Sequence, residues 1–555
     1  MAATLAIGSL SFSLLLSLIA FGHVLAGWAQ GAAVREAVNF TWFQFGTTNV
    51  DLGWILDPLS AVMLVMVSFV GLLIFIYSIG YMAHDENYTR FFCFLSLFAG
   101  AMLGVVISNS ILLLFMCWEI VGLTSYLLIG FWYQKPAAAA AAKKAFLTTR
   151  VGDIFFLLGI VWLFAQTGTL LFYNNGAGSI ESGSLTVLLT QPAALVAVAQ
   201  NDIKRILAYS TISQLGYMMA GLGMGGVAVG MFHLITHAFF KALLFMGAGS
   251  VIHGCHEEQD IRRMGGLRAD MPLTFLTYAI GMLALCGFPL LFSGFWSKDG
   301  ILEAAVMWHP SNAPFIMLVF GALLTAFYMT RQVSYVFFGT WRSKKPAHES
   351  PAVMTAPLAI LAFFAMALGL IGTPVWPWFR GFIESRAVPF DWHGFLEPGL
   401  LVVMAASTVL VFLGLGFGWW LYCGGAPSPE QPDVLEKATP LPWIWLRDRL
   451  YIDELYGVTV VAFYAWWAHV ADWLDRRVWG GVVAGVAWAF RGWADFNRFL
   501  DTKGVDGSFD KGCEELASGG GLLSRVQNGR VQTYLRILAF SVVALVAILI
   551  WSSLP

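Results

Sequence analysis

The feature that most constrains the fold is a succession of apolar segments, each about 20 residues long, that runs through most of the chain. A helix of that length crosses the ~30 Å hydrocarbon core of a bilayer. Because 58% of the 555 residues are hydrophobic and only 12% are charged, too little polar surface exists for a water-soluble body of this size. The sequence therefore predicts an all-α, polytopic membrane protein. Thirteen transmembrane helices are expected near 4–27, 55–80, 90–107, 110–133, 146–166, 183–200, 206–224, 228–252, 272–298, 313–339, 354–374, 398–422 and 534–553.

The positive charges of the short loops test this count. Twelve Lys and Arg residues lie after even-numbered spans and three after odd-numbered spans, and such an excess marks cytoplasmic loops. The N-terminus is therefore predicted to be cytoplasmic and the C-terminus periplasmic. The sixth span, 183–200, is the weakest because it carries Pro192, but without it the alternation breaks at residue 200. The twelve are Arg90, Lys135, Lys143, Lys144, Lys204, Arg205, Arg262, Arg263, Arg268, Arg342, Lys344 and Lys345, and the three are Arg35, Arg380 and Arg386.

The composition divides the chain into a helix bundle over 1–422, a segment over 423–533 and a C-terminal anchoring helix over 534–555. The middle segment opens rich in proline and continues with tryptophans interleaved with charges, a combination typical of the membrane interface. It is predicted to form a cytoplasmic-side linker and a long lateral amphipathic helix, with a further spanning hairpin as the alternative. Residues 501–524 are expected to form a flexible polar link.

Charged residues on the fourth and fifth spans need an explanation, because a charge at the bilayer centre costs at least ~2.5–3.5 kcal/mol. Glu119 lies in the middle of its span. Arg150 and Asp153 are three residues apart, on one face of a helix. They are either functional or a local structural ion pair. Asp57, which precedes Pro58 at a helix start, is interpreted as an N-cap.

The eighth span carries a stripe of ionisable residues. His233, His237 and Lys241 follow at i, i+4 and i+8, so they share one helix face with ~6 Å between neighbours. Histidine titrates near neutrality, and a desolvated lysine loses its proton more readily. The stripe therefore favours a proton path. The structural alternative is that the histidines only form hydrogen bonds between helices.

The ninth span combines helix-breaking residues with charge. Residues 287–289 read Gly-Phe-Pro, and Lys298 and Asp299 follow. Glycine and proline inside an apolar span predict a broken helix, whose freed backbone groups must face protein or water.

Other functions lack their sequence signals. The six cysteines form no CxxC pair, and no phosphate-binding glycine motif precedes a helix, so redox clusters and nucleotide binding are not expected in this chain. The net charge of −2 gives no indication of nucleic-acid binding. Residues 253–258 contain His, Cys and Glu in a loop, without a second pair of ligands nearby in sequence, and no metal site is predicted.

Several motifs resemble one family, the antiporter-like subunit L of the respiratory NADH:quinone oxidoreductase, complex I. The resemblance covers most of the chain. The motifs are WEIVGLTSYLLIG at 118–130, TRVGD at 149–153, NDIKRILAYST at 201–211, HAFFKALLF at 237–245, FWSKD at 295–299, YIDELY at 451–456 and VQNGRVQ at 526–532.

The resemblance implies a subunit that moves protons while other subunits carry FMN, the iron–sulfur clusters and quinone. It implies no cofactor in this chain. Its partners would be the other membrane-arm subunits, contacted through the lateral helix, in a bacterial inner membrane. Residue by residue, Glu119 matches the family's carboxylate, Lys241 its second-half lysine with His233 and His237 beside it, and Lys298 and Asp299 its exit-side pair. Arg150 and Lys204 are expected to support this path.

The sequence also departs from the family. Compared with the family, the chain is expected to begin at the second helix. Around 167–200 it is expected to lack the first broken helix, which carries the family's lysine partner of Glu119. A net loss of two helices preserves the topology. A buried carboxylate without a cation is expected to be protonated or to find another partner. The alternatives are a non-pumping scaffold subunit, a cation/proton antiporter subunit or a membrane subunit of an ion-pumping hydrogenase.

Overall fold

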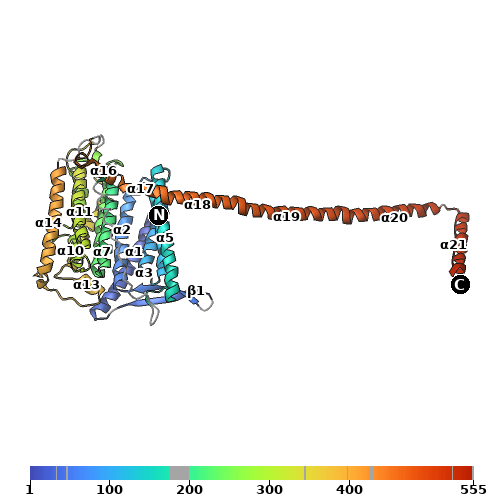
Figure 1. Ribbon diagram of the computed structural model, residues 1–555, viewed down its shortest axis with the longest axis horizontal. Coiled ribbons are helices and arrows are strands. Elements are labelled where there is room, and N and C mark those ends of the chain that lie inside the picture. Colours follow the sequence, from blue (N-terminus) through green and yellow to red (C-terminus); the bar gives the residue numbers. More distant parts are fainter. Residues whose placement is uncertain are drawn as a thin grey trace. The chain divides into compact units, whose positions relative to one another are not determined.

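The computed structural model is mostly helical and separates into two compact units, residues 1–461 and 462–555, which are described one at a time (Figure 1). The polytopic all-α architecture predicted from the sequence is confirmed. The structure describes residues 1–32, 34–45, 48–173, 199–342, 346–396, 398–423, 431–527 and 529–552.

Ten helices of this described part are long and apolar enough to cross a membrane, and each coincides with a predicted span. Nine belong to the first unit and the tenth, α21, to the second. They are α1 (Ala2–Ala29), α2 (Pro58–Tyr81), α3 (Tyr88–Ile107), α4 (Ile111–Ile129), α5 (Pro136–Thr167), α8 (Val227–Gly254), α11 (Ala313–Phe337), α12 (Ala352–Ala367, continued by the 3-10 turn Leu368–Gly372), α14 (Pro398–Tyr422) and α21 (Val531–Ser552).

The other three predicted spans have different outcomes. The seventh is the helix α7 (Ile203–Gly223), which is less apolar than the ten. The ninth is broken into α9 (Pro272–Cys286) and α10 (Ser293–Val306), as glycine and proline predicted. The sixth, 183–200, lies almost entirely outside the described residues.

Helix α8 lies at the centre of the first unit. Of its most apolar window 67% is buried, against 11% for α3 and α5. It packs against α2, α7, α9, α10 and α12, and these helices share one large hydrophobic cluster. Polar side chains on α8 are therefore shielded from lipid, whereas α3 and α5 expose mostly apolar residues.

A two-stranded antiparallel sheet joins α1 and α2 and was not predicted. Strand β1 (Glu36–Phe45) pairs with β2 (Thr48–Leu56), with Glu36 opposite Leu56. Aromatic and β-branched residues in both strands favour this conformation. Helix α2 begins directly after the sheet, and the Ser60 backbone N–H donates to Asp57 at 2.8 Å, which confirms Asp57 as the N-cap.

Short helices complete the first unit. After α12 comes α13 (Trp378–Ile383). After α14 come α15 (Val434–Ala438), α16 (Pro440–Arg447) and α17 (Ile452–Tyr456). The YIDELY motif therefore forms α17, which Asp453 ties to Lys144 of α5 by an ion pair of 3.1 Å.

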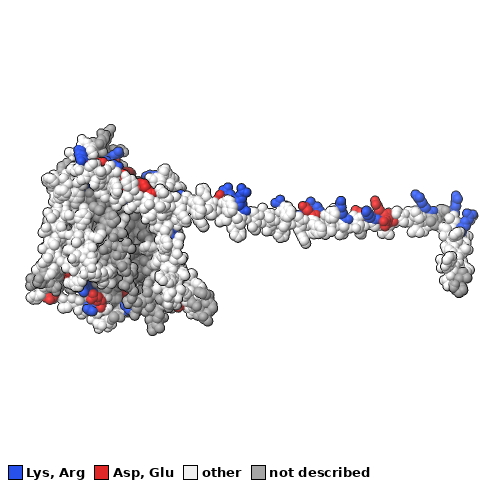
Figure 2. All heavy atoms as spheres, viewed as in Figure 1, with Lys and Arg blue, Asp and Glu red and all other residues white. Residues whose placement is uncertain are grey.

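The second unit begins with one continuous helix from Ala462 to Val526, roughly 100 Å long at ~1.5 Å per residue. It comprises α18 (Ala462–Trp473), α19 (Gly480–Phe499) and α20 (Gly507–Val526), joined by π-helical turns. Figure 2 shows its charged side chains along one edge, as expected of an amphipathic helix. The long helix predicted before the last span is confirmed, and the alternative of a spanning hairpin is wrong.

The flexible link predicted over 501–524 is also wrong, because these residues are helical. The glycines and charged residues in this stretch obscured the spacing of apolar residues that is typical of a helix. Phe509, Leu516 and Leu523 recur every seven residues and therefore lie on one face.

Candidate functional site

The stripe predicted on α8 lies in the interior of the bundle. His233, His237 and Lys241 are 0%, 6% and 5% exposed, respectively. The imidazole rings of His233 and His237 are 6.0 Å apart between centroids. Since α8 is surrounded by other helices, all three polar groups must find partners inside the protein.

Lys241 is held by neutral acceptors on α7. Its ammonium Nζ donates to the carbonyl oxygen of Leu207 at 3.1 Å and to the hydroxyl oxygen of Ser210 at 2.8 Å. The hydroxyl of Tyr328 on α11 donates to the same Ser210 oxygen at 2.8 Å. Among the described residues no carboxylate forms an ion pair with Lys241. The lysine can therefore lose its proton without leaving a buried anion behind.

His233 connects the stripe to the second half of the broken helix. Its Nδ1 lies 2.8 Å from the hydroxyl of Ser297 on α10, and its Nε2 lies 3.1 Å from Oε1 of Gln214 on α7. Thr236 donates to the same Ser297 oxygen at 3.1 Å. The Nε2 of His237 has no hydrogen-bond partner within the described part of the chain. The stripe is thus hydrogen-bonded to α10 through His233. The Nε2 of His237, which lies between His233 and Lys241 on α8, makes no hydrogen bond within the described residues.

The break between α9 and α10 creates the acceptor for Lys298. Helix α9 ends at Gly287, whose φ of +79° is the left-handed region that glycine tolerates. The chain then reverses, and Lys298 Nζ donates to the carbonyl oxygen of Leu285 at 2.5 Å. This carbonyl, in the last turn of α9, has no N–H to accept within the helix. This freed carbonyl therefore faces protein, one of the two outcomes predicted for the broken helix.

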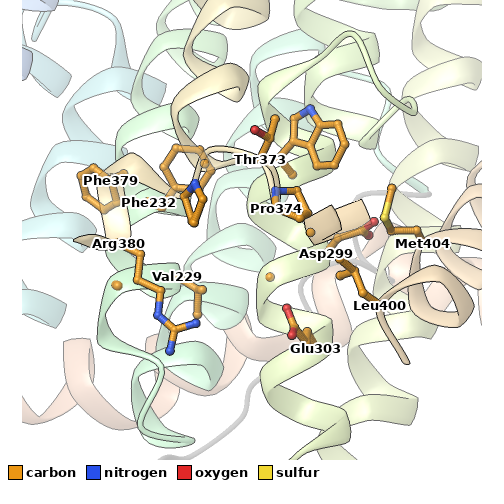
Figure 3. Close-up of a pocket in the computed structure, with 16 residues that line it drawn as sticks. Val229, Phe232, Asp299, Glu303, Thr373, Pro374, Phe379, Arg380, Leu400 and Met404 are labelled. Atoms are coloured by element: carbon orange, nitrogen blue, oxygen red, sulfur yellow. The ribbon is translucent and has the colours of Figure 1, made fainter. Parts of the chain in front are cut away.

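Asp299 follows Lys298 on α10 and is only 3% exposed. Its Oδ2 has no hydrogen-bond partner among the described residues. Asp299 lines a cavity of about 230 Å³ together with Glu303 and Arg380 (Figure 3).

Glu119, Arg150 and Asp153 form a separate cluster, the first-half triad. Arg150 pairs with Glu119 across α4 and α5, and its Nη1 lies 3.2 Å from Oδ2 of Asp153. Arg150 Nη2 also donates to the backbone carbonyl of Glu119 at 3.2 Å, and Trp118 Nε1 donates to Asp153 at 3.2 Å. Glu119 therefore has a cation, although no Lys or Arg occurs over 151–203.

Lys204 stands at the start of α7, apart from the stripe. Its Nζ donates to the hydroxyl of Tyr81 on α2 at 3.4 Å. It is partly buried and lies one turn before Leu207, whose carbonyl binds Lys241. The structure thus brings the predicted residues of α8 and α10 together. The first-half triad lies apart from them, on α4 and α5.

Sequence reasoning missed the most buried ion pair of the chain's described part. Arg331 on α11 is 0% exposed and bonds Oδ2 of Asp433 through Nη2 at 3.0 Å and Nε at 3.1 Å. Tyr335 and Tyr422 donate to the Asp433 carboxylate at 2.9 and 2.8 Å. Burial raises the pKa of Asp433, but the Arg331 charge and these hydroxyls outweigh it and lower that pKa. An arginine inside an apolar span was the available signal.

Comparison with known proteins places the chain among quinone oxidoreductase subunits. Residues 42–92 match the family "NADH-Ubiquinone oxidoreductase (complex I), chain 5 N-terminus". Residues 108–179 and 179–325 match "NADH:quinone oxidoreductase/Mrp antiporter, TM". The second match is divided at residue 179, within the stretch where a segment of the family is expected to be missing.

Curated relatives extend the match to nearly the whole chain. The chloroplastic NAD(P)H-quinone oxidoreductase subunit 5 of Chaetosphaeridium globosum is 32% identical, covering 98% of this chain and 92% of the relative. That alignment spans 665 positions, 110 more than the 555 residues here, so the relative has segments that this chain lacks. The F(420)H(2) dehydrogenase subunit L of Methanosarcina mazei is 41% identical over 60% of this chain and 65% of the relative.

Solved structures share the fold. A chain of the Mrp complex from Dietzia sp. DQ12-45-1b has a TM-score of 0.60 and 22% identity, covering 89% of this chain but only 62% of that chain. A chain of the membrane-bound sulfane sulfur reductase, an archaeal respiratory membrane complex, has a TM-score of 0.59 and 20% identity. The match covers 73% of this chain and 94% of the reductase chain.

Proposed function

The chain belongs to the subunit 5 or subunit L family of antiporter-like membrane subunits of NAD(P)H-quinone oxidoreductases, and we propose that protons cross its membrane bundle along the second-half axis. The second-half axis comprises His233, His237 and Lys241 on α8 with Lys298 and Asp299 on α10. The observation that carries this proposal is the environment of Lys241, which is buried and bonded only to neutral oxygens.

That environment suits a group that gains and loses protons. A lysine paired with a buried carboxylate stays charged, because deprotonation would leave the carboxylate unpaired. Lys241 instead faces a carbonyl and a hydroxyl, and the Ser210 hydroxyl can act as donor or acceptor. Both protonation states of Lys241 can therefore be satisfied in the same site.

Repulsion between two buried lysines supplies a driving force. The charges of Lys241 and Lys298 act on each other, and both act on His237. Like charges in a weakly screened interior oppose simultaneous protonation. Loading one lysine therefore favours release from the other, and His237 is positioned to pass the proton between them.

Electron transfer and partner contacts complete the proposal. We place the redox centres in other subunits of the complex, consistent with the names of the relatives. The exposed aromatic residues of α18 and α19 support contact of the lateral helix with neighbouring membrane-arm subunits or with the bilayer surface. The loop charges support a cytoplasmic N-terminus, and we place the subunit in a bacterial inner membrane because of the family resemblance.

The test is Lys241→Ala in the intact complex, in inverted membrane vesicles. Donor-driven acidification of the vesicle interior should fall at least ~10-fold per electron transferred, as expected when an essential proton carrier is lost. Lys143→Ala is the matched control, because Lys143 is an exposed lysine at the start of α5. Unchanged acidification by Lys241→Ala would contradict the proposal and favour the scaffold alternative.

A further inference from the structure

The cavity beside Asp299 lies at the end of the axis formed by Lys298 and Asp299. Its volume of about 230 Å³ gives room for several water molecules, each of which occupies ~30 Å³ in the liquid. The first two turns of α8, the helix α10, the loop 372–377 and the helix α13 contribute to its wall. That loop follows the eleventh predicted span, on the side that the charge pattern assigns to the cell exterior.

Asp299 supplies an unsatisfied group to this cavity. It is 3% exposed, and its Oδ2 lacks a hydrogen-bond partner within the described ranges. An unpaired buried carboxylate oxygen costs free energy unless water or a proton satisfies it. Asp299 also lines the cavity, so its carboxyl group borders the space that water can fill.

Glu303 lies one helical turn beyond Asp299 and lines the same cavity (Figure 3). The i, i+4 spacing puts both carboxylates on one face of α10, with ~6 Å of rise between them. Glu303 is partly exposed whereas Asp299 is buried. Two nearby carboxylates disfavour double ionisation, so a proton on one is readily exchanged with the other through water.

Arg380 contributes a positive charge from a different element, α13. Its Nε donates to Glu384 at 3.0 Å, and its side chain is 66% exposed. This ion pair fixes the guanidinium at the wall of the cavity.

We propose that Glu303 is the terminal proton-carrying residue, which receives protons from Asp299 through water in this cavity and releases them to the aqueous side. The inference rests on the proposed function. An O–H bond at Asp299 breaks as one forms on the first water, and the last water gives a proton to Glu303. The Glu303 O–H bond then breaks as the proton enters bulk water, and no electron is transferred.

The experiment compares variants of the intact complex in inverted vesicles. Glu303→Gln removes the titratable group and should lower donor-driven acidification per electron at least ~10-fold. Glu303→Asp keeps a carboxyl group and should restore it to within about threefold. Asp391→Asn is the matched control, because Asp391 is an exposed carboxylate near the same loop and does not line the cavity.

The outcomes separate this inference from the proposed function. If Lys241→Ala abolishes acidification while Glu303→Gln behaves like Asp391→Asn, the role of Glu303 is overturned and the axis stands. If neither variant lowers acidification, both proposals fail. If Glu303→Gln does not assemble, Ala228→Leu tests the route instead, because the larger side chain fills part of the cavity without changing its charge. Unchanged acidification in Ala228→Leu overturns the water-filled route.

Discussion

The first-half triad and the second-half axis both place charge inside an apolar bundle, but they satisfy it in different ways. In the triad the cation is Arg150, which contacts two carboxylates. In the axis the cations are Lys241 and Lys298, which donate to carbonyl and hydroxyl oxygens. The triad is also more accessible, since the Glu119 side chain is 32% exposed while Lys241 is 5% exposed.

This difference separates a fixed charge from a mobile one. Arginine stays protonated in proteins, so Arg150 can neutralise Glu119 but cannot take a proton from it. Lysine in a desolvated site exchanges its proton within the working range. With Arg150 beside Glu119 and no Lys or Arg over 151–203, the first half therefore keeps a cation for this carboxylate without the exchange chemistry. The proposed function thus places stability and proton transfer in different halves of one bundle.

The largest effect is expected when the lysine of the second-half axis is replaced by arginine, the cation of the first-half triad. Lys241→Arg keeps the positive charge but removes the ability to deprotonate, so donor-driven acidification should fall at least ~10-fold, about as much as in Lys241→Ala. Fluorescence quenching of an acidity-sensitive dye in inverted vesicles measures it. Donor oxidation in uncoupled vesicles serves as the control for assembly. Near-normal acidification with Lys241→Arg would show that a fixed charge suffices and would remove the distinction between the halves.

The axis was more predictable from the sequence than the triad. The spacing of His233, His237 and Lys241 alone fixes a shared helix face, and Gly287 with Pro289 predicts the break that exposes a carbonyl. Local periodicity carries this information. The partners of Lys241 come from α7, and Tyr328 of α11 bonds one of them, Ser210. Single serine or tyrosine residues give no comparable signal in an apolar span.

Pairings between distant segments could not be predicted from the sequence, because local periodicity does not say which helices pack together. The contact of Arg150 with Glu119 requires α4 and α5 to pack in one register, and Asp433 lies 102 residues from Arg331. The sheet of β1 and β2 and the helix over 501–524 were missed because charges and glycines obscured their periods. Side-chain packing, which decides such cases, is not local.

An intermediate effect is expected from removing the cation of the triad. Arg150→Leu leaves Glu119 and Asp153 unpaired within the span and should destabilise the subunit by roughly 3–5 kcal/mol, the cost of removing one partner of a buried ion pair. The midpoint of heat-induced loss of the subunit from the purified complex measures it. Replacing all three residues by leucine should recover most of the loss. No shift in Arg150→Leu would mean that the triad does not stabilise the bundle.

The smallest effect is expected at Glu119, which the family resemblance matches to the family's carboxylate. Glu119→Gln removes the charge but keeps the shape and an acceptor for Arg150, which still has Asp153 at 3.2 Å. If the first half holds only a fixed charge, acidification per electron should change by less than about twofold, while Lys241→Arg loses most of it in the same vesicles. A loss as large as that of Lys241→Arg would mean that Glu119 exchanges protons despite Arg150. The two halves would then work as one path. Some group other than Arg150 would have to exchange protons with Glu119, because arginine stays protonated.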